Sequence, residues 1–209
     1  MPAALYNAIQ GRSNERLAAL SDGIFAVAMT LLVLDIHIPS AEAIHSEAAL
    51  CHALLALGPQ WIAYLMSFLT LGIFWAGQQT QLNHFREGAR DLTWIHLGFL
   101  FTITLMPLTT RLLAEFIEYR SALILYWLNI LLPGLMLLWS WTYATHHELI
   151  KSETPPEVHG AICRRILIAQ GLYAFGALLC VFSNYVSIAF IVLIQLNYAI
   201  APRVGKRLG

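Results

Sequence analysis

The 209-residue chain is 58% hydrophobic and only 11% charged, and its mean hydropathy is +0.65. Roughly a quarter of the residues of a soluble domain are charged, so this composition excludes an ordinary soluble protein and indicates an integral membrane protein. Twelve Lys and Arg residues balance twelve Asp and Glu residues, and the zero net charge gives no general attraction to nucleic acid. The three cysteines lack any CxxC spacing, which argues against a disulfide framework or a cysteine metal site.

Apolar runs of about 20 residues, the length that crosses a bilayer, recur along almost the whole chain. We expect an all-α protein with one six-helix transmembrane domain over residues 1–209. Only Ser183, Asn184 and Tyr185 separate the last two runs, so five or seven spans are the alternatives. The predicted spans are about 17–38, 54–82, 92–114, 121–145, 161–182 and 184–201.

The first span opens with a cluster of ionisable and polar residues that includes Arg16, Ser21 and Asp22. Charges beside hydrocarbon are costly, so such a cluster is a functional hypothesis. Arg16 lies six residues before Asp22, which is too far for an i,i+4 pair. Each therefore needs a partner on another helix or in another subunit.

Helical geometry separates this cluster from an apolar stripe. On an ideal helix, Leu31 and Leu34 share a broad face with Val27, and Thr30 lies beside it. Ser21 and Asp22 lie about 120° and 140° from Val27, on the other side of the helix. The stripe could line a pathway while the polar residues face protein.

Two interpretations of this helix remain open. The small residues Ala18, Ala19, Gly23, Ala26 and Ala28 permit close helix packing, so the polar cluster could simply lock a central helix into a bundle. Alternatively, rings of apolar side chains can filter ions by forcing dehydration, provided that symmetry supplies the other helices. Asp35, near the outer end, could then concentrate cations or be only a hydrated charge at the end of the helix.

The later spans carry weaker signals. Pro107 interrupts the third predicted span and Pro133-Gly134 the fourth. Because these breaks do not occupy corresponding places in two repeated halves, isolated kinks are favoured over a transporter site. The adjacent pair His146-His147 does not share a helix face as a zinc-binding pair would. No cofactor and no resident metal are expected, and no nucleophile–base motif indicates an enzyme.

Charge predicts the orientation. With six spans, ten of the twelve Lys and Arg residues fall on one side of the membrane and two, Arg111 and Arg120, on the other. By the positive-inside rule, both termini are expected in the cytoplasm. The ten residues are Arg12, Arg16, Arg86, Arg90, Lys151, Arg164, Arg165, Arg203, Lys206 and Arg207.

The segment Arg16-Leu17-Ala18-Ala19-Leu20-Ser21-Asp22 resembles the RxxxFSD signature of the transmembrane protein 175 family of potassium channels. The apolar continuation to Ile36 is similar to the first helix of that family. Six spans in a chain of about 200 residues resemble its prokaryotic, single-repeat branch. Leu20 stands where the signature has Phe, and Val27 is smaller than the usual Ile or Leu.

This resemblance implies a homotetrameric cation channel in a bacterial inner membrane, with the first helix of each subunit lining the pore. It implies that Val27, five positions after the signature Asp, forms the narrowest constriction, with Leu31 and Leu34 continuing the lining and Thr30 nearby. The implied partners are K⁺ and other monovalent cations, the lipid bilayer and further copies of the chain.

The signature itself would hold the pore helix against its neighbours. The second helix resembles the family around Phe74-Trp75, although Gln78 and Gln79 stand where His is expected. His96 of the third helix lies near a position where Asn is common. The resemblance thus implies a hydrogen-bond network of Arg16, Ser21, Asp22, Trp75, Gln78 and His96.

From these features the sequence predicts a potassium-permeable channel with a hydrophobic constriction. The alternative is a secondary transporter that uses Asp22 as a proton or cation site. A third interpretation is a membrane scaffold without transport.

Overall fold

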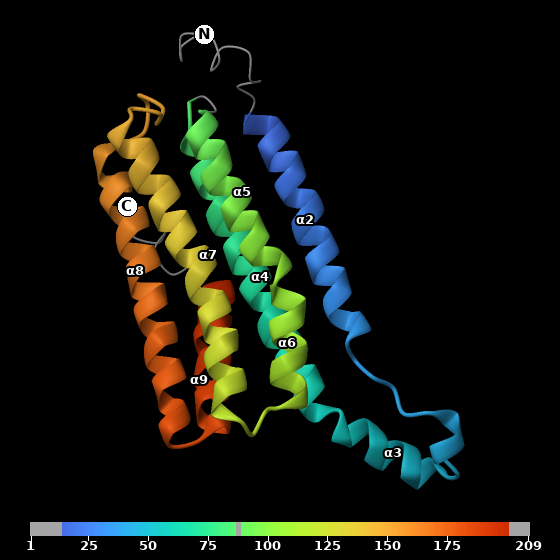
Figure 1. Cartoon of the computed structure of the whole chain (residues 1–209). Helices are drawn as coiled ribbons and strands as arrows, with labels where there is room; N and C mark the ends of the chain where they lie inside the picture. Colours follow the sequence, from blue (N-terminus) through green and yellow to red (C-terminus); the bar gives the residue numbers. More distant parts are fainter. Residues whose placement is uncertain (1–13, 87–88, 201–209) are drawn as a thin grey trace.

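The structure, a computed structural model, describes residues 14–86 and 89–200, and this part of the chain is helical apart from its turns and one isolated β-bridge. The helices form an elongated bundle (Figure 1). Their bounds are α2 Asn14–Leu34, α3 Glu47–Ala56, α4 Gly58–His84, α5 Arg90–Thr104, α6 Met106–Glu115, α7 Arg120–His146, α8 Pro156–Leu178 and α9 Asn184–Ile200, with 3-10 turns η1 at Ala41–Ala43 and η2 at Leu179–Val181.

Among the residues that the structure describes, five helical segments are long and apolar enough to cross a membrane, namely α2, α4, α5 with α6, α7, and α8 with η2. The sixth apolar run is α9, and its described part has 17 residues. These residues form about 25 Å of helix, against a hydrocarbon core of roughly 30 Å. The chain is thus an all-helical membrane protein, and a sixth full span stays a prediction.

The first span ends earlier than predicted. Helix α2 stops at Leu34, and the residues after Asp35 are extended as far as Ser40. Proline disfavours helical backbone in the residue that precedes it, which here is Ile38 before Pro39. The backbone N–H of His37 instead donates to Gln60 Oε1 (3.0 Å). The helix therefore ends four residues before the predicted end of the span at about residue 38.

The second predicted span divides at Leu57. Helix α3 ends just before it and extends away from the bundle (Figure 1), and none of the α3 residues described is buried. Helix α4 then begins with Gly58 and Pro59. Proline is well suited to the first turn of a helix because its missing N–H would have no partner there. The span proper starts at residue 58 instead of 54.

The two proline sites behave differently. The third span breaks at Leu105, and Pro107 lies in the first turn of α6. Pro133, in contrast, lies inside α7, which continues through it to His146. The fourth span is therefore not divided at Pro133, because neighbouring helices allow a transmembrane helix to tolerate proline, and the kink favoured by the sequence stays a prediction.

Loop contacts show which segments share one end of the bundle. Asn14 Nδ2 donates to the carbonyl oxygen of Phe85 (3.2 Å), and Lys151 Nζ donates to that of Asn83 (2.8 Å). The isolated β-bridge joins Phe85 to Ile150. The start of α2, the α4–α5 turn and the α7–α8 turn therefore lie together.

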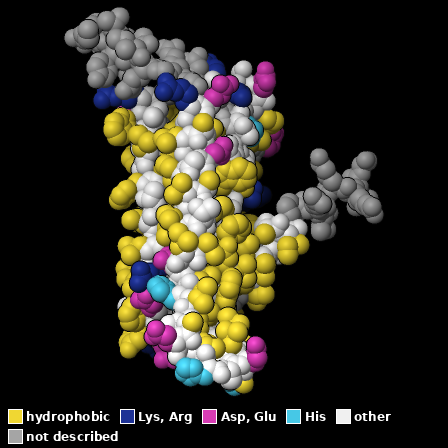
Figure 2. Space-filling model, turned by 90° about the vertical axis from the view of Figure 1, so that its right-hand side faces the viewer, with side chains coloured by type: hydrophobic (Ala, Val, Ile, Leu, Met, Phe, Trp, Pro, Cys, Tyr) yellow, Lys and Arg dark blue, Asp and Glu magenta, His cyan; other side chains and the backbone are white. Residues whose placement is uncertain are grey.

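The opposite end holds the α6–α7 and α8–α9 turns (Figure 1). There the Arg120 guanidinium donates to the carbonyl oxygen of Val181 (3.0 Å). Hydrophobic side chains cover most of the middle of the face in Figure 2, with charged side chains mainly toward its ends. Four of the basic residues counted above, Arg12, Arg203, Lys206 and Arg207, lie outside the described residues.

An aromatic cluster seats α2 on the bundle. The ring of Phe99 in α5 lies 6.0 Å from that of Phe25 in α2 and 6.3 Å from that of Phe74 in α4, measured between centroids. All three side chains are buried. Aromatic pairs at such distances stabilise a core beyond the area that they bury. This cluster fixes the height at which α2 meets α4 and α5.

Candidate pore helix and its polar support

Helix α2 has one buried face. Ser21, Phe25, Ala28 and Leu32 are its buried residues. Their spacing of four, three and four residues defines a single helical stripe. This stripe packs against α4, α5 and α6. Ile24 and Met29 are half-buried beside it, and most other residues of the helix are exposed in a single copy of the chain.

The residues predicted to line a pore lie on the open side. Val27 is 58% exposed and Leu34 is 73% exposed, and Leu31 is also exposed. Val27 and Leu31 belong to a surface groove of about 440 Å³, whose other wall includes Thr104 and Pro107 at the α5–α6 break. The groove is apolar, so one copy of the chain presents an uncovered hydrophobic surface along α2.

Thr30 and Asp35 differ in their settings. The Thr30 hydroxyl lies 2.9 Å from the carbonyl oxygen of Val27 and 3.0 Å from that of Ala26, and so bonds within its own helix. Asp35 is half-buried in the turn that follows α2. Its backbone carbonyl oxygen lies 2.8 Å from His37 Nδ1. Asp35 thus lies one residue beyond the helix that carries the predicted lining.

Asp22 is held by α4. Its Oδ1 atom accepts hydrogen bonds from Trp75 Nε1 (2.7 Å) and from Gln79 Nε2 (2.9 Å). Trp75 and Gln79 are four residues apart and therefore lie on the same face of α4. Hydrogen bonds to a carboxylate are stronger than those between neutral groups. Two donors on one face fix the position of Asp22 against α4.

Ser21 begins a second, fully buried set of contacts. Its hydroxyl donates to Gln78 Oε1, and Gln78 Nε2 lies 3.5 Å from His96 Nδ1. On the other side of the ring, His96 Nε2 lies 3.1 Å from Ser140 Oγ in α7. With Gln78 Nε2 as a donor, His96 Nδ1 must accept, which places the proton of the neutral ring on Nε2. The chain of contacts links α2, α4, α5 and α7.

Arg16 lies in the first turn of α2, where its side chain is exposed. The structure brings Ser21, Gln78 and His96 together in one set of contacts and Asp22 and Trp75 in another.

Two members of these contacts were absent from the predicted network. Gln79 could have been found, because it follows Trp75 by one helical turn and so shares its face. Ser140 had no comparable signal, since 44 residues separate it from His96. Periodicity within a helix predicts faces, but it cannot predict which distant face lies opposite.

Comparison with known proteins relates these helices to a channel family. Residues 16–107 match the family described as the endosomal/lysosomal potassium channel TMEM175. The match covers α2, α4 and α5, and so contains the whole predicted lining and all the predicted polar residues.

Individual bacterial relatives agree with this match. A protein of Streptomyces collinus named as a potassium channel is 37% identical over 107 residues, which span 51% of this chain and only half of that protein. A protein of Chamaesiphon minutus with the same description is 28% identical over 195 residues, which span 88% of this chain and 93% of that protein.

A solved structure extends the likeness to the fold. The crystal structure of a lysosomal potassium-selective channel TMEM175 homolog from Chamaesiphon minutus matches with a TM-score of 0.76 at 26% sequence identity. The match covers 89% of this chain and 96% of that one. The likeness therefore extends well beyond residues 16–107, the part matched to the family.

Proposed function

We propose that the chain is a member of the transmembrane protein 175 family, which its similarities support, and that it is a potassium-permeable cation channel. Four copies would assemble so that the Val27 face of α2 in each copy lines a central pore. One observation carries this proposal: a single helix combines an uncovered apolar face with Asp22 fixed to α4 through two hydrogen bonds.

Further copies of the chain, related by symmetry, would enclose the pathway that one copy leaves open. The groove beside Val27 and Leu31 is open along one side, so one subunit cannot enclose a pathway. Closed rotational symmetry places the same surface of each copy around one axis. The homotetramer expected from the family resemblance would bring four Val27 side chains to one level.

Three apolar levels then follow one another along the pore. From Val27 to Leu31 and Leu34 the helix rises about 10 Å in total. An apolar constriction admits a cation only at the cost of its hydration shell and can gate by dewetting. Thr30, beside this stripe, bonds to its own helix, and it adds a polar oxygen near the lining. Carboxylates of Asp35 at the outer mouth would raise the local concentration of cations.

The polar residues behind α2 act as a support. We assign Arg16, Ser21, Asp22, Trp75, Gln78 and His96 to positioning the pore helix, and Gln79 and Ser140 join them. Asp22 Oδ1 already accepts two hydrogen bonds, which favours a structural carboxylate over a mobile ion carrier. Its position on the side of α2 that faces α4 supports the same assignment.

The proposed location is the inner membrane of a bacterial cell, with both termini in the cytoplasm. The end of the bundle that holds the α4–α5 and α7–α8 turns carries Arg86, Arg90 and Lys151. The opposite end carries Arg120. Loops rich in Lys and Arg stay on the cytoplasmic side of membranes.

Recordings from planar bilayers that contain the purified chain would test the proposal. A K⁺/Na⁺ gradient should give single-channel currents that reverse toward the K⁺ equilibrium potential. Well-folded tetramers that carry no current would contradict it. Saturable flux coupled to a second substrate would instead indicate the secondary transporter, with Asp22 as its proton or cation site.

A further inference from the structure

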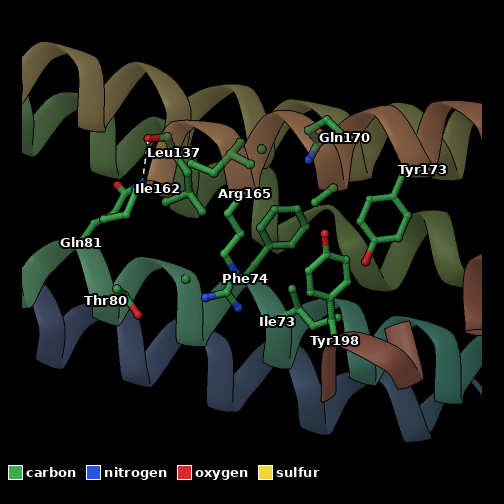
Figure 3. A pocket seen from close by; sticks show the side chains of 14 residues that line it. Ile73, Phe74, Thr80, Gln81, Leu137, Ile162, Arg165, Gln170, Tyr173 and Tyr198 are labelled. Atoms are coloured by element: carbon green, nitrogen blue, oxygen red, sulfur yellow. Dashed lines mark hydrogen bonds between the residues drawn. The ribbon is translucent and has the colours of Figure 1, made fainter. Parts of the chain in front are cut away.

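A second cavity lies inside the subunit, away from the pore helix. It has a volume of about 80 Å³ and lies between α4, α7, α8 and α9 (Figure 3). Its walls are mostly apolar and include Ile73, Phe74 and Ile166. Three polar side chains of α8, Arg165, Gln170 and Tyr173, also line it (Figure 3).

The last described helix forms one wall of the cavity. Helix α9 packs against both α4 and α8, and its described part extends from the far end of the bundle to Ile200. Tyr198, near the end of this described part, lines the cavity.

The polar groups that line the cavity have unused hydrogen-bonding capacity. Within residues 14–86 and 89–200, Gln81 Oε1, Gln170 Oε1 and the Tyr173 hydroxyl are buried without a hydrogen-bond partner. Buried polar groups are nearly always paired with protein or a ligand or water, so such a group needs an explanation. The Arg165 guanidinium likewise makes no hydrogen bond or ion pair within the described residues.

Arg165 lies at an unusual depth for a cation. It is nine residues beyond the start of α8 at Pro156, about 13 Å along the helix. Long side chains on a helix point back toward its N-terminus, and arginine extends its charge toward the membrane surface. Figure 3 shows Arg165 reaching from α8 across the cavity toward α4. Arg165 is exposed and also lines the cavity, so a ligand can reach its guanidinium from outside the bundle.

We propose that this cavity binds an anionic phospholipid of the adjoining leaflet, with the lipid phosphate on Arg165. A guanidinium offers a planar fork of donors that matches a phosphate, and basic pockets between transmembrane helices bind anionic headgroups. Deeper in the cavity, the Tyr173 hydroxyl donates to an ester carbonyl oxygen of the lipid. The apolar walls beside Phe74 and Ile166 hold the first part of an acyl chain.

Native mass spectrometry of the full-length chain in detergent tests this site. Delipidated protein is titrated with phosphatidylglycerol or with phosphatidylcholine, and bound lipid is counted per subunit. Phosphatidylglycerol should bind at least tenfold more tightly than phosphatidylcholine. Arg165→Gln should raise the Kd for phosphatidylglycerol at least tenfold, which corresponds to about 1.4 kcal/mol.

Arg164→Gln is the matched control. Arg164 is the adjacent arginine of α8 and is exposed, as Arg165 is, but it does not line the cavity, so its loss should leave the Kd unchanged within about twofold. If both substitutions weakened phosphatidylglycerol binding equally, the lipid would be attracted by positive charge in general and not by a specific site. That result would overturn the proposal. Equal affinity for the two lipids would also overturn it.

Two further measurements complete the test. Arg165→Lys keeps the charge but loses the fork, and Tyr173→Phe loses only the deep donor, so both should fold and weaken binding by a smaller factor. If Arg165→Gln does not fold, unchanged binding in both of these variants would overturn the proposal. Competition with inorganic phosphate should not displace the lipid, since displacement would assign Arg165 to a soluble anion.

Discussion

Gly134 in α7 and Gln170 in α8 interlock. A Cβ atom placed on Gly134 would lie 1.8 Å from Gln170 Nε2 and 2.5 Å from its Cδ. No side chain fits at those distances, so the absence of one at Gly134 lets Gln170 lie directly against the backbone of α7. Glycine at helix interfaces allows this kind of close approach in membranes.

We predict that Gly134→Ala destabilises the protein by about 1 kcal/mol, the low end of the cost of overpacking, because the Gln170 side chain that must move is flexible and borders the cavity. The double variant Gly134→Ala/Gln170→Ala should recover most of this loss, because alanine removes the atoms that clash. Thermal unfolding of the purified protein measures both. Gly171→Ala is the control, since its Cβ would meet nothing within 4 Å, and a melting point lowered equally by Gly171→Ala would contradict the explanation.

Substitutions of Asp22 distinguish the proposed channel function from the alternative of a secondary transporter. Asp22→Asn keeps an oxygen that can accept from Trp75 Nε1 and Gln79 Nε2, so a support role predicts K⁺ currents within a few-fold of the wild type. Asp22→Leu removes both hydrogen bonds and should lower stability by about 1–3 kcal/mol, toward the smaller value because the side chain is exposed. Bilayer recordings and thermal unfolding give the two readouts. Abolition of all flux by Asp22→Asn in a folded protein would favour a transporting carboxylate.

The sequence could predict the faces of α2, because those depend only on the period of one helix. The 100° rotation per residue separates Val27 from Ser21, and the structure has the same separation, with Ser21 fully buried and Val27 exposed. The similarity to the potassium channel family could likewise be predicted from the seven residues that end at Asp22. Both predictions depend only on residues that are close together in the sequence.

Contacts between distant segments and the ends of helices could not be predicted in this way. Hydropathy continues through Ile36 and Ile38, so an apolar window extends the first span beyond Leu34. Similarly, Pro133 has the same local chemistry as Pro107, yet only Pro107 lies at a helix break. The packing of neighbouring helices determines where a helix ends or breaks. That packing depends on segments that are distant in the sequence, so one segment alone does not predict it.

A buried cluster of hydroxyl and amide groups joins four helices toward the end of the bundle that holds the α6–α7 and α8–α9 turns. The Tyr126 hydroxyl lies 3.1 Å from Ser67 Oγ and 3.3 Å from Thr70 Oγ1. Thr110 Oγ1 donates to Ser67 Oγ, and Gln195 Nε2 donates to Thr70 Oγ1, both over 2.7 Å. These contacts link α4, α6, α7 and α9 through neutral groups.

We predict that Tyr126→Phe lowers the free energy of unfolding by about 0.6–1.7 kcal/mol, the range found for hydrogen bonds between membrane helices. Tyr119→Phe serves as the control, because Tyr119 is 63% exposed and should change stability very little. Denaturant titration in detergent micelles measures both. Equal effects of the two substitutions would show that the cluster contributes no net stability.

Val27 is the residue on which conduction should depend most. Four valines at the narrowest level would set both the width of the pore and the dehydration that an ion must undergo. Val27→Ala removes two methyl groups from each side chain, so it should raise single-channel conductance and lower the K⁺/Na⁺ permeability ratio several-fold. Reversal potentials under a K⁺/Na⁺ gradient measure this ratio directly.

The same substitution elsewhere on α2 controls for a general effect of losing side-chain volume. Val33 is also exposed, but six residues after Val27 it lies about 120° around the helix, away from the predicted lining. Val33→Ala should therefore leave conductance and selectivity within about twofold of the wild type. If Val33→Ala altered the permeability ratio and Val27→Ala did not, the conducting face of α2 would have to be reassigned.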